Sequence, residues 1–416
     1  MKTPTDNMQV SEDTVLQPGV YFLPNGIHLA EDGITLDGNG ALLIGQGKRG
    51  RGVSLQGKKG ITIKNLRARE YYHGIWAQDC QGLTIANCHF SATAEVPANS
   101  IFLDIWLPAE RTYGGGILLW QVEDAQISGN DLSHQMNGLL TYHCHHLRVK
   151  ENLANYCSGF GFHLHHTCDS LFEGNYADFC CRYQPREEGI GHMGADAAGF
   201  LLVYHSCGNI FRRNLARLGG DGFFLAGLTP QLEPAPCNDN LFEGNDGSYS
   251  PNIAFEATFS RGNIYRDNRA DYCNYGFWLG FSREGVLENN RMWRNRQAGI
   301  ATENGFDFQV RGNTFQYNNH GILLWSKHIP EFTQAVPENT TSYDWVIEGN
   351  TFIGNRKAIR IAADQDHGIR PHLVEGKPAP PTPPPFHHTI RNNRFEENVV
   401  EIEEEGVKDS TLEGNE

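Results

Sequence analysis

Residues 264–290 read IYRDNRADYCNYGFWLGFSREGVLENN and contain two copies of one short pattern. Each copy is a β-type stretch that ends in an asparagine, and the two asparagines, Asn268 and Asn290, are 22 residues apart (290 − 268 = 22). Between them lies GFWLG, a second short stretch of strand-forming residues that begins with a glycine. The pattern indicates a repeat built from short strands and turns.

The same asparagine recurs along most of the chain. Its spacing is 22 or 23 residues where no insertion intervenes, and the positions are Asn65, Asn87, Asn130, Asn152, Asn175, Asn214, Asn245, Asn268, Asn290, Asn313, Asn350, Asn393 and Asn415. Strands this short cannot bury an apolar face alone, but coils stacked on one another can, as in a solenoid. An asparagine amide at a fixed corner can bond the local backbone and the asparagine of the next coil, so we expect an asparagine ladder.

Composition agrees with a chain of strands and turns. The 416 residues include 46 glycines, and only 20% of them are charged. Such a composition favours an all-β protein with many turns. Leucine-rich repeats have a similar length, but they need a leucine framework and a helical convex side, and neither pattern is present.

The asparagine repeat resembles that of the right-handed parallel β-helix superfamily, the pectin-lyase-like proteins with short parallel β-helix repeats. The resemblance covers residues 60–416, and residues 1–59 resemble the entry coils of such proteins. It implies an all-β fold, a single-stranded right-handed parallel β-helix of about a dozen coils. We expect one domain over residues 1–416, with long loop insertions near residues 89–115, 182–198, 227–239, 326–343 and 364–388.

Alternation along the strand after each glycine assigns its two faces. The first and third positions are almost uniformly apolar, as in Ile75 and Ala77, and we expect them in the core. The second and fourth positions face outward and carry an aromatic stripe with two histidines, namely Trp76, Trp120, Tyr142, His163, His165, Phe224, Trp278 and Trp325. Aromatic rings with a few polar groups suit a sugar-binding groove, in which the rings stack on sugars and the histidines bind hydroxyl groups. Alternatively, the insertions cover this face and bury the aromatic rings as a satellite core.

Two pairs of carboxylates are candidates for catalysis. Glu256 and Glu303 are assigned to one outward column two coils apart, which predicts backbones roughly 9 to 10 Å apart and suits an inverting glycosidase pair. Asp221 in LGGDGFF and Asp196 in GHMGADAAG precede neighbouring strands, where adjacent like charges would raise one pKa into the range of a general acid. Turn formation explains these two aspartates equally well. Glu256 is the first candidate for the catalytic acid.

The stretch GFGFHLHHTCD at residues 159–169 contains three histidines, His163, His165 and His166. A metal site would need a third ligand from the next coil, and the matching outward positions there hold no usual ligand. We therefore expect a hydrogen-bonding sugar subsite at His163 and His165 and no metal or other cofactor, although metal binding and incidental exposure stay open. The direction of His166 is also open.

The net charge limits the possible binding partners, and the cysteine content indicates the cellular compartment. A net charge of −15 argues against nucleic acid and against an acidic membrane surface, and more weakly against a polyuronate. The N-terminal residues show no apolar segment of a signal peptide, and no apolar run is long enough to span a membrane. Ten dispersed cysteines in such a chain predict free thiols and a cytoplasmic protein.

The resemblance implies fold more strongly than function, since this fold carries many activities. We expect a glycoside hydrolase or an intramolecular glycosyl transferase that acts on a neutral oligosaccharide. One alternative is a polysaccharide lyase or epimerase on an anionic sugar, with Tyr142 or a histidine as base and a carboxylate neutralised by Arg111, Arg182, Arg186 or Arg283. Another is a non-catalytic carbohydrate-binding protein. The sequence leaves the oligomeric state open.

Overall fold

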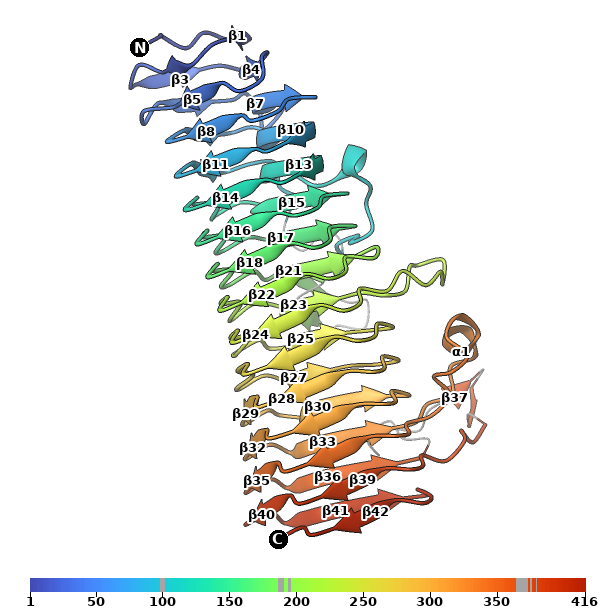
Figure 1. The fold of residues 1–416 in the computed structure, drawn as a ribbon. Helices are drawn as coiled ribbons and strands as arrows, with labels where there is room; N and C mark the ends of the chain where they lie inside the picture. The colour runs from blue at the N-terminus through green and yellow to red at the C-terminus, as the bar shows by residue number, and fades with distance from the viewer. Residues whose placement is uncertain (98–101, 186–190, 194–195, 364–372, 375, 379) are drawn as a thin grey trace. The chain divides into compact units, whose positions relative to one another are not determined.

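The computed structural model describes residues 1–97, 102–185, 191–193, 196–363, 373–374, 376–378 and 380–416. The chain separates into two compact units, Met1–Asp221 (unit 1) and Gly222–Glu416 (unit 2). Each unit is built of coils that run through short parallel strands (Figure 1). The expected all-β parallel β-helix is thereby confirmed, whereas the expectation of a single domain stays a prediction.

Unit 1 contains three parallel sheets. The strands of the first sheet are, in order, β1 (Met8–Val10), β4 (Ile27–Leu29), β7 (Arg51–Gln56), β10 (His73–Gln81), β13 (Gly115–Glu123), β15 (Leu139–Tyr142), β17 (Phe160–His165) and β21 (Ala198–Val203). Those of the second are β2 (Thr14–Val15), β5 (Thr35–Asp37), β8 (Thr62–Lys64), β11 (Thr84–Ala86), β14 (Gln126–Ser128), β16 (Arg148–Lys150), β18 (Leu171–Glu173) and β22 (Ile210–Arg212). The third is short, with β3 (Val20–Phe22), β6 (Leu42–Ile44), β9 (Arg67–Arg69) and β12 (His89–Ser91).

Unit 2 repeats this arrangement. Its first sheet contains β25 (Ile253–Ala257), β27 (Tyr275–Trp278), β30 (Ala298–Glu303), β33 (His320–Trp325), β36 (Lys357–Ala362) and β41 (Val400–Glu405). The second contains β24 (Leu241–Glu243), β26 (Ile264–Arg266), β28 (Val286–Glu288), β31 (Gln309–Arg311), β34 (Val346–Glu348), β39 (Thr389–Arg391) and β42 (Thr411–Glu413). The third contains β29 (Arg291–Trp293), β32 (Thr314–Gln316), β35 (Thr351–Ile353) and β40 (Arg394–Glu396).

The remaining elements lie in insertions or at the unit boundary. They are the 3₁₀ turn η1 (Ala109–Arg111), the antiparallel pair β19 (Tyr183–Pro185) and β20 (Gly191–Met193), β23 (Asp221–Leu225), α1 (Pro330–Ala335), and the antiparallel pair β37 (Leu373–Val374) and β38 (Lys377–Pro378). No helix in the described residues is long and apolar enough to cross a membrane. None of the ten cysteines, all of which lie in the described residues, forms a disulfide bond, and Cys168, Cys181 and Cys207 are partly exposed.

The predicted asparagine ladder is present in each unit. In unit 2, Asn290 donates its side-chain amide to Asn313 Oδ1 (3.0 Å) and to the Tyr265 carbonyl (2.9 Å), while accepting from Asn268 (3.0 Å). Asn65 and Asn87 are not part of this ladder, because each lies one position earlier in its turn than the ladder asparagines do. There the backbone is left-handed, with φ of 54° at both, which asparagine tolerates better than most residues.

Close packing of successive coils explains the glycine that opens many strands of the first sheet. A Cβ on Gly276 would lie 2.6 Å from the Gly299 carbonyl oxygen, and one on Gly299 would lie 2.8 Å from the carbonyl oxygen of Gly321. Beyond each glycine the expected core residues are buried, and aromatic rings stack from coil to coil, as Phe255 does on Phe277 at 4.9 Å. The opposite face of these strands therefore holds the side chains available for function.

Candidate functional site

A groove runs along the outer face of the first sheet in unit 1. One part, of about 370 Å³, is lined by Gln9, His28, Leu29, Arg51, Ser54, Leu55, Gln56 and Trp76. A second part, of about 550 Å³, shares Arg51, Gln56 and Trp76 and continues to Tyr72, Gln78, Glu110 and Trp120. Since the two parts share three residues, they form one continuous groove over β1 to β13.

The strand register sets the chemistry of this groove. Gln56, Gln78 and Trp120 are paired in sequence across β7, β10 and β13, so two amides and an indole ring form one column. Neighbouring coils are about 4.8 Å apart, a spacing at which one sugar ring can contact two of these side chains at once. Trp120 is partly exposed and meets the prediction of an outward aromatic side chain.

Trp76 was predicted to be an exposed stacking ring, but it is largely buried. Only 8% of this residue is exposed, and the Arg51 guanidinium lies 3.5 Å from the centre of its ring. The cation therefore covers one face of the indole. Arg51 and Glu110 bring a cation and a carboxylate into the groove, and both lie outside the outward positions that the sequence pattern singled out.

Further along unit 1 the outer face is covered. Ala109 packs in one apolar cluster with Trp76, Leu118, Leu140 and Tyr142, and the Tyr142 hydroxyl donates to Thr112 Oγ1 at 2.7 Å. Tyr142 is 0% exposed. An exposed stacking ring at Tyr142 was thus a wrong expectation, because the insertion that carries Ala109 and Thr112 lies across this part of the sheet.

His163 and His165 lie under the same cover. They are 2% and 7% exposed and pack on Tyr142, with ring centres 5.4 and 4.9 Å from its own. Their ring nitrogens are buried and make no hydrogen bond within the described part of the chain. Burial lowers the pKa of each imidazole to about 3, so both are neutral near neutral pH. In this structure their rings are not accessible to sugar hydroxyls.

His166 turns away from that buried pair. It takes a left-handed backbone conformation, with φ of 51°, and its ring lies 4.9 Å from that of His143 and 6.3 Å from that of His205. These rings belong to turns of successive coils at the end of the strands. Among the described residues, no group of three or more His, Cys, Asp or Glu side chains could hold a metal ion.

Asp196 and Asp221 lie on neighbouring coils. The Asp221 amide donates to the Ala197 carbonyl oxygen at 3.2 Å, which brings the two aspartates to the same end of their strands. Burial raises the pKa of Asp196 to about 7, and Asp221 is 2% exposed. A raised pKa was expected from mutual repulsion, whereas desolvation is the cause that the structure supplies.

Glu256 and Glu303 do not share a column. Glu256 pairs with Trp278, and Trp278 with Ala301, whereas Glu303 pairs with Trp325. The offset of two residues and two coils separates the two backbones by roughly 12 Å. The predicted register was wrong because IAFEA lacks the leading glycine, so that Ile253, which is buried as expected, was aligned with Phe277 instead of Tyr275.

The outward aromatic residues of unit 2 form a small cluster of their own. Trp325 is 1% exposed and packs edge-on against Trp278, with ring centres 5.3 Å apart. Ala298, Ala301 and Leu323 belong to the same cluster, and Tyr275 packs against it. Trp325 therefore offers no ring face to a ligand, Phe224 is 8% exposed, and Trp278 is partly exposed.

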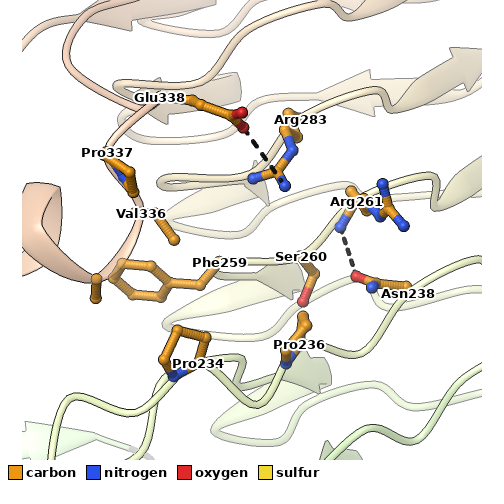
Figure 2. Close-up of a pocket in the computed structure, with 11 residues that line it drawn as sticks. Pro234, Pro236, Asn238, Phe259, Ser260, Arg261, Arg283, Val336, Pro337 and Glu338 are labelled. Carbon is orange, nitrogen blue, oxygen red and sulfur yellow. Dashed lines mark hydrogen bonds and ion pairs between the residues drawn. The ribbon is translucent and has the colours of Figure 1, made fainter.

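A separate cleft of about 470 Å³ lies in unit 2 (Figure 2). It is lined by Pro234, Pro236, Asn238, Phe259, Ser260, Arg261, Arg283, Ala335, Val336, Pro337 and Glu338. Its walls come from the predicted insertions 227–239 and 326–343. Its floor comes from turn residues that follow the strands, which the strand pattern could not select. Of the arginines expected to neutralise a sugar carboxylate, Arg283 lies here and Arg186 lies outside the described residues.

The two other arginines of that set lie in unit 1. Arg182 is 4% exposed and donates to the carbonyl oxygens of Ser158 (3.2 Å) and Val96 (3.0 Å), which ties its guanidinium to the backbone. Arg111 is exposed at the end of η1. Neither lines the groove, so Arg51 is the cation that does.

The repeat pattern matches a known family of proteins. The model described as the right handed beta helix region matches residues 25–216 and 99–251, which together span more than half of the chain. The chain belongs to the right-handed parallel β-helix superfamily. A second model, described as periplasmic copper-binding protein (NosD), matches residues 235–370 of this β-helix chain. Since no metal-holding group is found in the described part of that range, we derive no chemical step through copper.

Solved β-helix structures are similar at low identity. The A-module of mannuronan C-5 epimerase AlgE6 from Azotobacter vinelandii is 14% identical, with 98% of this chain and 91% of that chain covered and a TM-score of 0.42. The GH136 lacto-N-biosidase from Eubacterium ramulus is 13% identical, with 83% of this chain and 62% of that chain covered and a TM-score of 0.49. The catalytic domain of GH87 alpha-1,3-glucanase, solved with tetrasaccharides, is 9% identical, with 96% of this chain and 66% of that chain covered and a TM-score of 0.47. No curated protein matches this β-helix chain.

Proposed function

We propose that this β-helix protein is a carbohydrate-active enzyme that cleaves or rearranges glycosidic bonds of a neutral oligosaccharide. The observation that carries the proposal is the column of Gln56, Gln78 and Trp120 in the groove of unit 1. Amides bind hydroxyl groups without requiring charge, and an indole face stacks on the CH face of a sugar ring. The groove is open along several coils and so suits a chain of sugars better than a single compact metabolite.

Asp196 is the candidate proton donor. It does not line the groove but precedes β21, three coils beyond β13 and past the covered part of the sheet, so a bound glycan would have to extend that far to reach it. With a pKa of about 7, a large share of its carboxyl groups is protonated at neutral pH, as protonation of a glycosidic oxygen requires. Asp221, on the neighbouring coil, is the candidate for the second carboxyl group, and because only 2% of it is exposed it would have to become accessible before acting as base or nucleophile. Glu110 lines the groove itself and is a further candidate for contact with sugar hydroxyls. Glu256 stays a candidate acid, but the pairing with Glu303 no longer supports this assignment.

The test uses a panel of neutral oligosaccharides with products identified by mass spectrometry. Wild-type protein should release or rearrange sugars, Asp196→Asn should bind the same glycan but turn it over at least about 100-fold more slowly, and Trp120→Ala should weaken binding. Glu151→Gln is the matched control, because this carboxylate is exposed on a turn of unit 1. Unchanged turnover in Asp196→Asn would remove Asp196 from the mechanism, and no product from any glycan would favour a non-catalytic binding protein.

A lyase or epimerase on an anionic sugar is the second candidate. Arg51 favours it, because this guanidinium lies in both parts of the groove and could neutralise a sugar carboxylate. A lyase leaves an unsaturated product that absorbs in the near ultraviolet, an epimerase changes the uronate composition without shortening the chain, and a hydrolase shortens the chain without that absorbance. Incubation with polyuronates and with neutral glycans, read by absorbance, chain length and uronate composition, therefore separates the candidates.

A cytoplasmic location is part of the same proposal. It is supported by the ten cysteines, which form no disulfide bond and seven of which are buried. Fractionation of the native host, followed by detection of the protein with an antibody, tests it. Recovery outside the cytoplasm would contradict this part of the proposal and leave the catalytic assignment untouched.

A further inference from the structure

The cleft of unit 2 is divided into an apolar part and a charged part. Phe259, Pro234 and Val336 gather on one side, and the guanidinium groups of Arg261 and Arg283 lie on the other (Figure 2). Its volume of about 470 Å³ is in the range of small-molecule sites. We propose that this cleft binds a small carboxylate ligand with an aromatic or aliphatic body.

The apolar wall is built from three separate segments. Phe259 stacks on Phe281 at 5.1 Å, and Phe332 of α1 meets both rings edge-on at 5.1 and 5.2 Å. Pro234 and Pro236 come from one insertion, and Val336 and Pro337 from the other. Prolines and packed rings lose little conformational entropy when a ligand binds, so this wall is preorganised for an apolar body.

The charged side has donors that are only loosely engaged. Arg283 is 3.4 Å from Glu284 and 3.6 Å from Glu338, and Arg261 is 4.0 Å from Glu284. A charge-assisted hydrogen bond is shorter, at about 2.8 Å. The side chain of Arg261 is 52% exposed. The Glu284 carboxylate is near both guanidinium groups, so a ligand carboxylate would compete with it and, at Arg283, with Glu338, and would gain the short bonds that these ion pairs lack.

Glu338 indicates which anion fits. Its carboxylate, with the side chain 64% exposed, already lies at Arg283 and stands where a ligand carboxylate would go (Figure 2). A phosphate carries up to two negative charges and would meet both Glu284 and Glu338, which favours the singly charged carboxylate. Glu338 is then a competitor tethered to the protein, which the ligand must displace from Arg283. Removing the Glu338 carboxylate should therefore tighten ligand binding, an effect that can be measured separately from the loss of either arginine.

The probes are N-acetylphenylalanine, its neutral amide N-acetylphenylalaninamide, and phenyl phosphate, each titrated calorimetrically into the full chain. We expect the acid to bind about tenfold more tightly than the amide, and phenyl phosphate to bind less tightly than the acid. Equal affinity for acid and amide would overturn the anion site. Tighter binding of phenyl phosphate would overturn the assignment to a carboxylate.

Variants locate the binding. Arg261→Gln and Arg283→Gln should each weaken the acid about tenfold, whereas Glu338→Gln should tighten it about threefold because the competitor is removed. Arg294→Gln is the control, since Arg294 is an exposed arginine of unit 2 that stacks on Trp293 away from the cleft. Thermal melting identifies any variant that fails to fold. Weaker or unchanged binding in folded Glu338→Gln would refute the displacement and with it the proposed site.

Discussion

The guanidinium carbon of Arg51 lies 3.5 Å from the centre of the Trp76 ring, so that a cation and an indole meet at the floor of the unit 1 groove. Such a contact, partly shielded from water, contributes about 1 kcal/mol. We expect a double-mutant cycle of Arg51→Gln and Trp76→Leu to give a coupling energy of that size in urea unfolding. A coupling near zero would mean that the two side chains are neighbours without interacting.

Asn290 should be far more important for stability than the asparagine beside it. Asn290→Ala removes two donated hydrogen bonds and the oxygen that accepts from both the backbone N–H and one side-chain N–H of Asn268, so we expect a loss of about 2 to 4 kcal/mol in the free energy of unfolding. Asn289→Gly is the control, because Asn289 is exposed at φ of 55°, a conformation that glycine adopts freely. Similar losses in both variants would show that the ladder adds little to stability.

Acid should destabilise unit 1 through His163 and His165. Both have a pKa lowered to about 3 by burial, while their unfolded pKa is near 6.5. As the pH falls below 6.5 the unfolded chain takes up protons at these two histidines and at His73, whose pKa burial also lowers to about 3, and the folded unit does not accept these three protons until about pH 3. Stability is thus fully present above pH 6.5 and decreases below it, by up to about 4.1 kcal/mol per pH unit, of which His163 and His165 account for about 2.7. Urea midpoints measured between pH 8 and 4 should follow this slope.

Removing the two imidazoles should flatten that dependence. We expect the double variant His163→Asn, His165→Asn to lose most of the decrease, whereas His387→Asn, at an exposed turn of unit 2, should keep it. An unchanged slope in the double variant would assign the acid sensitivity to other groups.

The raised pKa of Asp196 predicts the shape of the rate profile. If Asp196 donates the proton, its protonated form is the active one, and kcat should decrease above about pH 7. The pH dependence of turnover on a glycan found by the panel tests this directly. In Asp196→Asn the alkaline limb should vanish together with most of the activity, and a limb that survives in that variant would belong to another group.

The sequence was sufficient for the fold because the repeat depends on local rules. The spacing of Asn268, Asn290 and Asn313 reports the length of one coil, and the buried amide ladder requires that spacing to be kept. Alternation around each leading glycine separated core from outer face wherever the glycine was present. Where it was absent, at Ile253, the register moved by two residues, and the proposed Glu256 and Glu303 pair moved with it.

The site was harder to predict, because its accessibility depends on insertions without any periodicity. Nothing in the strand pattern indicates that Thr112 would reach Tyr142, or that Ala109 would close over the same face. The cleft of unit 2 was missed for a related reason. Phe259, Arg261 and Arg283 occupy turns, where alternation carries no information about direction.

The asparagine ladder of unit 2 has a direction, because each amide from Asn245 to Asn393 donates to the asparagine that follows it in the chain. A coil that docked one residue out of register would bury an amide facing no partner, which costs about 1 to 3 kcal/mol at once. Each asparagine thus penalises misalignment of the coil that docks on it. One residue per coil is in this way enough to select the correct register along the solenoid.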